Sequence, residues 1–470
     1  MHPERQPYGP AGTGCGLSSV RSGHRLVPRL LAVRRTLSGF LWIALYLVVV
    51  MAPIGLMLVP PVPTGRSFWV EASVALGFVG LTQIGVQFVL IARFRPLTYP
   101  YGIDVVLRYH RQIAVVALGF VLLHPVLILI EHPARLALLN PLGGTYASKL
   151  GLAAVAALVL LTVTAVWRER LDIGYEAWRL SHTLLGVAAL VFAQAHVSLA
   201  GLYINTLWKQ ALWIASSLAL VGVVVYLWLV QPWLQRRRPW RVVGVRDEGG
   251  GTVNLDVEPV GHAGLRFEPG QFAWLKVGDT PYAVEEHPYS FASSAEEPGR
   301  LSFGVKALGD FSERLQHVDE GTCVYLDGPH GAFSIDRAQA AGYVFIAGGV
   351  GITPMMSFLH TMADRGDPRP VLLFYSTGTE EELAYSDEIE ALKERLDLEV
   401  VFVLEEPPSD WAAEEGMVTQ ELLERRLPAE PFARQYFVCG PPPMMAAVQD
   451  ALLALGVPRT HVHQEKFALA

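Results

Sequence analysis

Six long apolar runs are the feature that most restricts how this chain can fold. All lie in the first half of the 470-residue sequence, at 37–59, 69–92, 109–131, 149–167, 178–199 and 207–230. Each run has enough apolar residues for a helix to cross the hydrocarbon core of a bilayer, which takes about 20. Backbone groups in lipid must be hydrogen-bonded within their own segment, so the runs predict six membrane-spanning helices. The first run is longer than the apolar region of a signal peptide, and Pro60-Pro61 follows it instead of a cleavage site.

Charge divides the chain into two halves and predicts its orientation. Residues 1–240 contain 20 Lys and Arg against 7 Asp and Glu, whereas residues 241–470 contain 17 against 37. The acidic second half argues against nucleic acid as a partner. Basic residues gather before the first run, in the second and fourth connections, and after the sixth run. The positive-inside rule therefore predicts an integral protein of the cell membrane, in contact with lipid, with both termini and the whole acidic half in the cytoplasm.

Four histidines inside the apolar runs form two pairs with equal spacing. His110 and His124 lie in the third run, and His182 and His196 lie in the fifth, 14 residues apart in both cases. On a helix, 14 residues make nearly four turns and roughly 21 Å, so each pair keeps to one face. One span separates the two runs, so they run parallel. The histidines are therefore expected to come level in two layers, His110 with His182 and His124 with His196.

Each layer could place two imidazoles on opposite sides of one haem iron, for which histidine is a common axial ligand. A single histidine in a span can also be a hydrogen-bonding residue that packs helices together. Ionisable residues at this depth are rare and usually functional, and two pairs with identical spacing favour ligands over packing. We therefore predict two b-type haems, with His110, His124, His182 and His196 as the ligands of the haem iron.

The second half begins near Trp240 with short alternating stretches that Gly and Pro turns separate, as in a small antiparallel barrel. Within it, His287-Pro288-Tyr289-Ser290 offers an aromatic ring and a hydroxyl that could hold a flavin. Next comes Lys306-Ala307-Leu308-Gly309-Asp310-Phe311-Ser312, a tight turn that opens a helix. Its amide groups and Ser312 could receive a pyrophosphate at the helix N-terminus. Each motif alone is also compatible with ordinary turn chemistry.

From about residue 342 the pattern changes to strands that alternate with helices. The apparent strand 343–347 leads into Gly348-Gly349-Val350-Gly351-Ile352-Thr353-Pro354, and a helix follows. Glycines in such a turn let the backbone approach a dinucleotide phosphate. Further apparent strands are 371–375, 400–404 and 435–438, and the last runs into Cys439-Gly440-Pro441. This order predicts an α/β nucleotide-binding domain with a parallel sheet.

The motifs in this order resemble the NADPH oxidase and ferric reductase superfamily, of the bacterial type without EF-hands. The resemblance covers the chain from about residue 37, and its cytoplasmic part is similar to ferredoxin–NADP reductase modules. It rests on the paired histidines, His287-Pro288-Tyr289-Ser290, Gly349-Val350-Gly351-Ile352-Thr353-Pro354, Cys439-Gly440-Pro441 and the tail His463-Gln464-Glu465-Lys466-Phe467. It implies FAD, two b haems and NAD(P)H as donor, with catalytic roles for Cys439, Glu465 and Phe467. The residues expected to bind cofactors are His287, Pro288, Tyr289, Ser290, Lys306, Gly309, Asp310, Phe311, Ser312, Gly349, Gly351, Thr353, Pro354, Gly440 and Pro441.

The resemblance predicts the function and the domain plan together. We expect electrons to pass from cytoplasmic NAD(P)H to an acceptor outside the cytoplasm, either dioxygen, giving superoxide, or a ferric chelate. Two alternatives are a redox protein that reduces a periplasmic or membrane protein or a quinone, and a transporter or sensor with a regulatory nucleotide module. The sequence leaves the oligomeric state open. The predicted segments are a disordered arm at 1–36, a six-helix all-α bundle at 37–235, an antiparallel β-barrel FAD domain at 240–337 and a nucleotide-binding domain at 338–470.

Nucleotide choice is the one point on which the residues and the resemblance differ. The resemblance implies NADPH, whose 2′-phosphate needs a cation. After the apparent strand that ends at Tyr375, the chain instead offers Ser376-Thr377-Gly378-Thr379-Glu380-Glu381-Glu382. Three carboxylates would repel a phosphate, whereas one carboxylate can accept a hydrogen bond from a ribose hydroxyl. We therefore predict that NADH is used at least as well as NADPH, unless Arg365, Arg369 or Arg395 reaches the phosphate.

Overall fold

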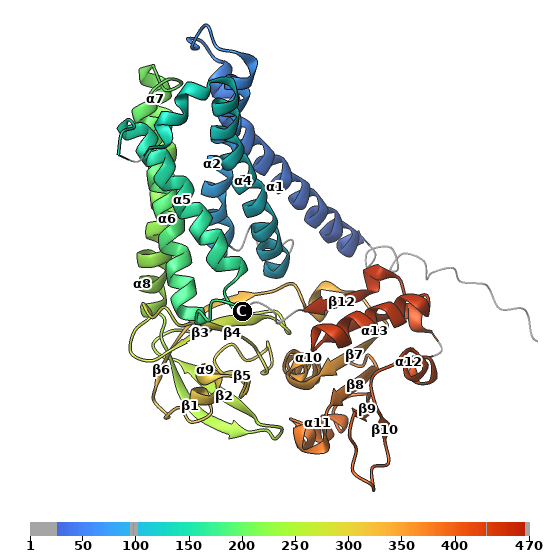
Figure 1. Ribbon diagram of the computed structural model, residues 1–470. Coiled ribbons are helices and arrows are strands. Elements are labelled where there is room, and N and C mark those ends of the chain that lie inside the picture. Colours follow the sequence, from blue (N-terminus) through green and yellow to red (C-terminus); the bar gives the residue numbers. More distant parts are fainter. Residues whose placement is uncertain (1–25, 95–96, 98–101, 141, 429, 466–470) are drawn as a thin grey trace, which may run out of the picture.

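The computed structural model describes residues 26–94, 97, 102–140, 142–428 and 430–465, and it places an apolar helical bundle on two β domains (Figure 1). Six of the described helices are long and apolar enough to cross a membrane. They are α1 (Leu26–Leu58), α2 (Phe68–Ile91), α4 (Ile103–Glu131), α5 (Tyr146–Val166), α6 (Tyr175–Ala200) and α7 (Leu207–Val225). The last continues through a π-helical turn, η2 (Tyr226–Val230), into α8 (Gln231–Arg236). All six predicted spans are thus present.

The bundle is built from two helix hairpins. Helix α2 packs along α4, and α5 packs along α6. Ser67 caps the start of α2 by accepting a hydrogen bond from the Val70 amide, and Thr145 caps α5 in the same way. Small and aliphatic residues such as Ala157 and Ala189 are buried where the two hairpins meet, which allows close approach of the helices. Helix α1 slants away from the other five in Figure 1.

The N-terminal prediction and the structure differ over one segment. Helix α1 begins at Leu26, so residues 26–36, which we assigned to a disordered arm, are helical. Pro28 lies in the first turn, where proline is tolerated because that amide has no helical partner. No Gly or Pro follows until Gly39, so nothing in the sequence interrupts the helix before the apolar run. Residues 1–25 of the predicted arm lie outside the described residues.

The first β domain is a curled antiparallel sheet directly below the bundle (Figure 1). Its strands are β1 (Trp240–Asp247), β2 (Thr252–Pro259), β3 (Phe272–Val277), β4 (His287–Ser290), β5 (Leu301–Lys306) and β6 (Cys323–His330). They pair in the order β4-β3-β6-β1-β2-β5, and a bridge between Phe291 and Phe303 joins the two ends of the sheet. The inward faces bury an aliphatic and aromatic core. The curl agrees with the predicted barrel.

The second β domain is a parallel sheet with helices on both faces. Its strands are β7 (Gly342–Gly348), β8 (Val371–Thr377), β9 (Leu398–Leu404), β10 (Glu414–Glu415), β11 (Arg434–Cys439) and β12 (Val462–Glu465), in the order β10-β9-β8-β7-β11-β12. Helices α10 (Ile352–Arg365) and α11 (Ser386–Lys393) pack on one face. Helices α12 (Gln420–Arg426) and α13 (Pro442–Ala454) pack on the other. Strands β10 and β12, which are short edge strands, were not predicted from the sequence.

Candidate redox site

The four span histidines meet in the two predicted layers. The ring centres of His110 and His182 lie 6.4 Å apart, and those of His124 and His196 are also 6.4 Å apart. We call His110 and His182 the near pair, because their helices α4 and α6 start at the β domains, and His124 and His196 the far pair. A metal–imidazole bond is about 2 Å long. A ring-centre distance of 6.4 Å therefore suits one metal ion held between two facing imidazole nitrogens.

The far pair is held by hydrogen bonds from neighbouring helices. His124 Nδ1 lies 2.9 Å from the Ser73 carbonyl oxygen and 3.0 Å from Ser73 Oγ, both on α2. His196 Nδ1 lies 2.7 Å from the Ala147 carbonyl oxygen on α5. A carbonyl only accepts, so each Nδ1 carries the proton and each Nε2 keeps its lone pair for a metal. Carbonyl partners of this kind orient metal-ligating histidines in proteins.

Two glycines give the far rings their space. A Cβ atom at Gly77 would lie 3.2 Å from the His124 ring, and one at Gly151 would lie 2.9 Å from His196 Nδ1. Gly77 belongs to α2 and Gly151 to α5, the same helices that supply the carbonyl partners. Each far histidine is therefore fixed by one neighbouring helix, through a hydrogen bond on one side and close backbone packing on the other.

The near pair has a different environment. His110 Nδ1 and His182 Nδ1 are both buried without a hydrogen-bond partner. The Trp178 ring lies 5.2 Å from the His182 ring, one turn earlier on α6. Of the basic residues near this layer, Arg108 and Arg111 are exposed, whereas Arg179 donates hydrogen bonds to the Val284 carbonyl and to Glu286 of the curled-sheet domain.

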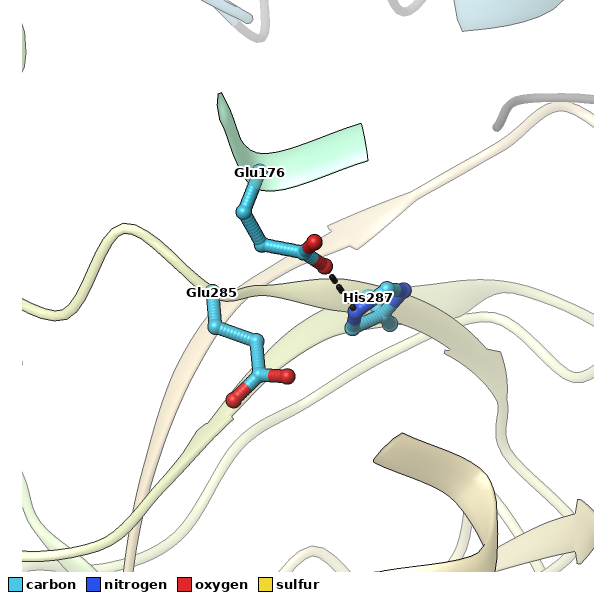
Figure 2. Close-up of side chains that lie close together, drawn as sticks. All are labelled: Glu176, Glu285 and His287. Atoms are coloured by element: carbon cyan, nitrogen blue, oxygen red, sulfur yellow. Dashed lines mark ion pairs between the residues drawn. The ribbon is translucent and has the colours of Figure 1, made fainter. Parts of the chain in front are cut away.

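The predicted flavin motif forms strand β4 at the base of the bundle. The His287 ring lies 4.4 Å from Phe311, the Tyr289 ring lies 6.3 Å from it, and Ser290 is buried. His287 also reaches the membrane helices: its Nε2 is 3.8 Å from a carboxylate oxygen of Glu176, in the first turn of α6. Figure 2 shows Glu176 extending from α6 toward His287 on β4, with Glu285 beside His287. Burial lowers the pKa of His287, so its ring is neutral at pH 7.

The ligand atoms of Glu176, Glu285 and His287 lie within 4.8 Å of one another, a spacing that could hold a cation. Arg314 already pairs with Glu285 at 2.5 Å, which supplies the positive charge at this point. The cluster is therefore satisfied as a contact between α6 and β4.

The turn before α9 (Asp310–Leu315) is closed by its own serine. Ser312 Oγ accepts from the Leu308 amide at 2.9 Å and the Gly309 amide at 3.0 Å, and it donates to the Gly309 carbonyl at 2.8 Å. The hydroxyl thus shapes the turn, and its role as a free pyrophosphate donor stays a prediction. Lys306 Nζ, at the start of this turn, lies 3.9 Å from a carboxylate oxygen of Glu382, in the acidic turn that follows β8.

The two predicted nucleotide motifs meet at one edge of the parallel sheet. Strands β7 and β11 are neighbours, and the sheet order reverses between them, which is where ligands bind in such folds. A Cβ atom at Gly351 would lie 2.2 Å from the Cys439 carbonyl oxygen, and one at Gly440 would lie 3.0 Å from Gly348 Cα. Only glycine fits this approach. Thr353 and Pro354 follow, buried at the start of α10.

The predicted catalytic residues are only partly described. Cys439 ends β11 and is fully buried, its Sγ lies 3.6 Å from the Glu465 carbonyl oxygen, and burial raises the pKa of its thiol well above the ordinary value. Glu465 ends β12 beside it, because β12 pairs with β11. Phe467 lies outside the described residues.

In the described part of the chain, the ion pairs of the acidic turn after β8 involve Lys306 and no arginine. Glu380–Glu382 form a short 3₁₀ turn, η5. The three arginines that could have reached it are paired elsewhere: Arg365 with Asp336 and Glu296, Arg369 with Asp367, and Arg395 with Asp364.

A buried group of charges that the sequence analysis missed joins the bundle to the curled sheet. Arg93, just after α2, donates to Asp327 at 2.8 Å and to Glu286 at 2.5 Å. Arg179 of α6 donates to Glu286 at 2.6 Å. In the sequence, these arginines indicated only the orientation of the chain in the membrane, because no local pattern marks Glu286 or Asp327 as their partners.

Family models match the chain over both halves. A ferric reductase like transmembrane component matches residues 76–193, an FAD-binding domain matches 245–351, and an oxidoreductase NAD-binding domain matches 345–450. The chain has the domain architecture of the NADPH oxidase and ferric reductase superfamily. The multidomain fold, the integral membrane character and the oxidoreductase modules that this superfamily implies are thus confirmed.

Two curated relatives each match less than half of the chain. The reductase component of propane 2-monooxygenase from Rhodococcus jostii is 35% identical over 46% of this chain and 59% of its own length. NADH-cytochrome b5 reductase 1 from Debaryomyces hansenii is 31% identical over 36% of this chain and 61% of its own. This chain therefore spans about three fifths of each of these relatives. A solved FAD/NAD-binding domain of nitric oxide dioxygenase from Vibrio cholerae O1 biovar El Tor is 26% identical, with a TM-score of 0.44, over 49% of this chain and 98% of that one.

Proposed function

We propose that the chain is a transmembrane oxidoreductase that moves electrons from NAD(P)H, through FAD and two b haems, to an acceptor on the far side of the membrane. The observation that carries the proposal is the pair of histidine layers, each with ring centres 6.4 Å apart, on helices that begin next to the curled sheet. FAD, when bound, would supply the exchange between two-electron nicotinamide chemistry and one-electron haem chemistry.

The residues of the chain then have separate tasks. The glycines at the ends of β7 and β11 admit the nucleotide backbone to the sheet edge, with Cys439 and Glu465 beside it. Tyr289 and Ser290 bind the flavin on β4, between that edge and the bundle. The near and far histidines hold one haem each. We propose that the β domains are cytoplasmic, so that the negative potential inside the cell drives electrons outward by about 2.3 kcal/mol per 100 mV.

The acceptor is limited by the ligand number. A haem with two histidine ligands has no open position, so the acceptor receives the electron without binding the iron. Dioxygen, which would give superoxide, and a ferric chelate both meet this requirement. A quinone or a partner redox protein is the second candidate, and a transporter with a regulatory nucleotide module is the third.

Anaerobic stopped-flow spectroscopy of the purified full-length protein tests the proposal. We expect NADH to reduce the flavin first and both haems afterwards. The reduced protein is then mixed in parallel with dioxygen, a ferric chelate and a quinone. The acceptor that reoxidises the haems fastest is the one that the experiment favours. A protein in which NADH reduces no haem would contradict the redox function and leave the regulatory alternative.

Nucleotide choice is tested by the same flavin reduction. Glu380–Glu382 closely follow β8, where the 2′-phosphate of a bound NADPH is expected, and burying a phosphate without a cation is costly. We expect NADH to be used at least as well as NADPH. A kcat/KM for NADPH more than about tenfold above that for NADH, roughly 1.4 kcal/mol, would show that a cation reaches the phosphate.

A further inference from the structure

Arg93 has a strained, left-handed backbone conformation, which the contacts of its side chain offset. Helix α2 ends at Ile91 with Ala92 as its C-cap, and Arg93 follows with φ of 53°. This left-handed position after a helix is usually glycine, since a Cβ atom there is strained. The Arg93 guanidinium lies 4.0 Å above the Trp274 ring and hydrogen-bonds two carboxylates of the curled sheet. Nothing in the helix itself requires an arginine here, so the contacts with the other domain account for it.

The charges around Arg93 are complementary across the junction. The bundle contributes Arg93 and Arg179, and the sheet contributes both carboxylates, Glu286 and Asp327. The side chains of Glu286 and Asp327 are only 5% and 15% exposed. Burial raises the pKa of Glu286, but the charges of Arg93 and Arg179 outweigh it and hold that pKa below its ordinary value. The Glu286–Arg93 and Glu286–Arg179 pairs are therefore ionised at neutral pH, in surroundings where water screens the charges little.

Further contacts complete the group from both sides. Lys276 Nζ lies 3.6 Å from a Glu286 oxygen, and Gln231 of α8 donates to Asp327 at 2.8 Å. His330 Nε2 lies 3.2 Å from the other Asp327 oxygen. Residues at the ends of three spans, namely α2, α6 and the α8 continuation of α7, thus bind Glu286 and Asp327 of the curled-sheet domain.

Contacts with the curled-sheet domain lie at the start of both helices that carry the near histidines, α4 and α6. Arg179 is three residues, or about one turn, before His182 on α6. Ile103, the first residue of α4, packs with Phe272 and Trp274 of the sheet, and His110 lies two turns further along. Because β4 pairs with β3, which carries Trp274, a shift of this junction would move the flavin motif relative to the near pair.

We propose that Arg93 and Arg179, with Glu286 and Asp327, form a buried ionic clasp that positions the flavin-binding sheet under the near histidine pair and so sets the rate of electron transfer between the two halves. The inference rests on the proposed function. Arg93 and Arg179 are positioning residues, because they touch neither histidine. The rate of electron transfer falls as the distance between donor and acceptor grows, so a loosened clasp has a measurable effect.

Two variants that remove the clasp from the bundle side test it. Arg93→Gly deletes the side chain and places at this position glycine, which adopts a positive φ without strain. Arg179→Met removes the guanidinium but retains an unbranched apolar side chain. Arg425→Met is the matched control, because Arg425 pairs with Glu414 within the nucleotide domain and 62% of its own side chain is exposed. Flavin reduction by NADH and subsequent haem reduction are followed separately in anaerobic stopped flow of the full-length protein.

We expect Arg93→Gly and Arg179→Met to slow haem reduction at least about tenfold while flavin reduction stays within about twofold. Arg93→Lys, which keeps the charge but loses the forked donor, should fall between the variant and the parent. The control should match the parent in both steps. Parent-like haem reduction in the Arg93→Gly/Arg179→Met double variant would overturn the proposal.

Two further outcomes are separated by the same measurements. A variant that loses bound flavin or haem, or that slows flavin reduction and haem reduction together, has a purely structural defect. If Arg93→Gly, Arg179→Met and Asp327→Asn all showed such a defect, the proposed role of the clasp would also be overturned. Asp327→Asn preserves the side-chain shape and serves where an arginine variant fails to fold. Failure of the parent protein to pass electrons from NADH to haem would instead reject the proposed function.

Discussion

The two histidine layers share a ring separation of 6.4 Å but differ in what fixes their rings. In the far layer, each Nδ1 is bonded to a main-chain carbonyl of a neighbouring helix, and a glycine of that helix packs on the ring. In the near layer, both Nδ1 atoms are buried without a partner. The far rings are therefore oriented by the bundle itself, whereas the near rings depend on packing and on whatever they bind.

The difference follows the position of each layer in the fold. The far layer lies where α2 packs along α4 and α5 along α6, so backbone from a second helix is always within reach. The near layer adjoins the junction with the curled sheet, where α4 and α6 begin. Carbonyl partners raise the basicity of a histidine ligand and fix its ring. We infer that the far layer is preorganised for its haem and that the near layer is the more adaptable one.

The largest expected effect comes from removing the ligands. His124→Ala or His196→Ala should abolish the far haem, and His110→Ala or His182→Ala the near haem, because one histidine cannot supply both axial ligands. Each variant should lose one of two haem equivalents in a pyridine haemochrome assay. With the near haem gone, flavin reduction by NADH should persist while the far haem is no longer reduced. Normal haem content in His124→Ala would refute the far assignment.

An intermediate effect is expected from the glycines that distinguish the far layer. Gly151→Ala places a methyl group 2.9 Å from His196 Nδ1, so the ring or the helix must shift. Overpacking of this kind costs about 1–3 kcal/mol, which should weaken far-haem binding roughly 5- to 150-fold. Gly119→Ala on α4 is the matched control, since a Cβ atom there meets no atom within 4 Å. Haem titration of the apoprotein measures both, and equal affinities would refute the role of Gly151.

The smallest effect is expected from Ser73→Ala. The hydroxyl is one of two acceptors for His124 Nδ1, and the Ser73 carbonyl stays in place. Loss of an outer partner typically lowers metal affinity by 10–100-fold, and here the remaining carbonyl should hold the loss to about tenfold or less. The near haem should bind as in the parent. Trp178→Phe gives the reverse comparison, because that ring contacts only the near layer at His182. If Ser73→Ala changed the near haem more than the far one, the contrast between the layers would be wrong.

Much of the architecture was predictable from local patterns. The six spans, the antiparallel and parallel domains, and the strand before each glycine motif follow from hydrophobic periodicity, which helix and strand geometry impose residue by residue. The layering of His110 with His182 and of His124 with His196 also follows from sequence, because 14 residues is close to a whole number of helical turns. Strands β10 and β12 were missed because short edge strands carry too few alternating residues to give a pattern.

The contacts that distinguish the parts of the site were decided only by the tertiary structure. Ser73 and His124 are 51 residues apart, and Arg93 and Asp327 are 234 apart, so no local pattern links them. The same holds for Ser312, whose sequence suggested a phosphate donor but whose hydroxyl closes its own turn. Local sequence determines which helices and strands form, because their hydrogen bonds and periodicity are short-range. Which backbone carbonyl orients a histidine, and which carboxylate receives a buried arginine, depends on how the helices and sheets pack, because those partners meet only after the domains have assembled.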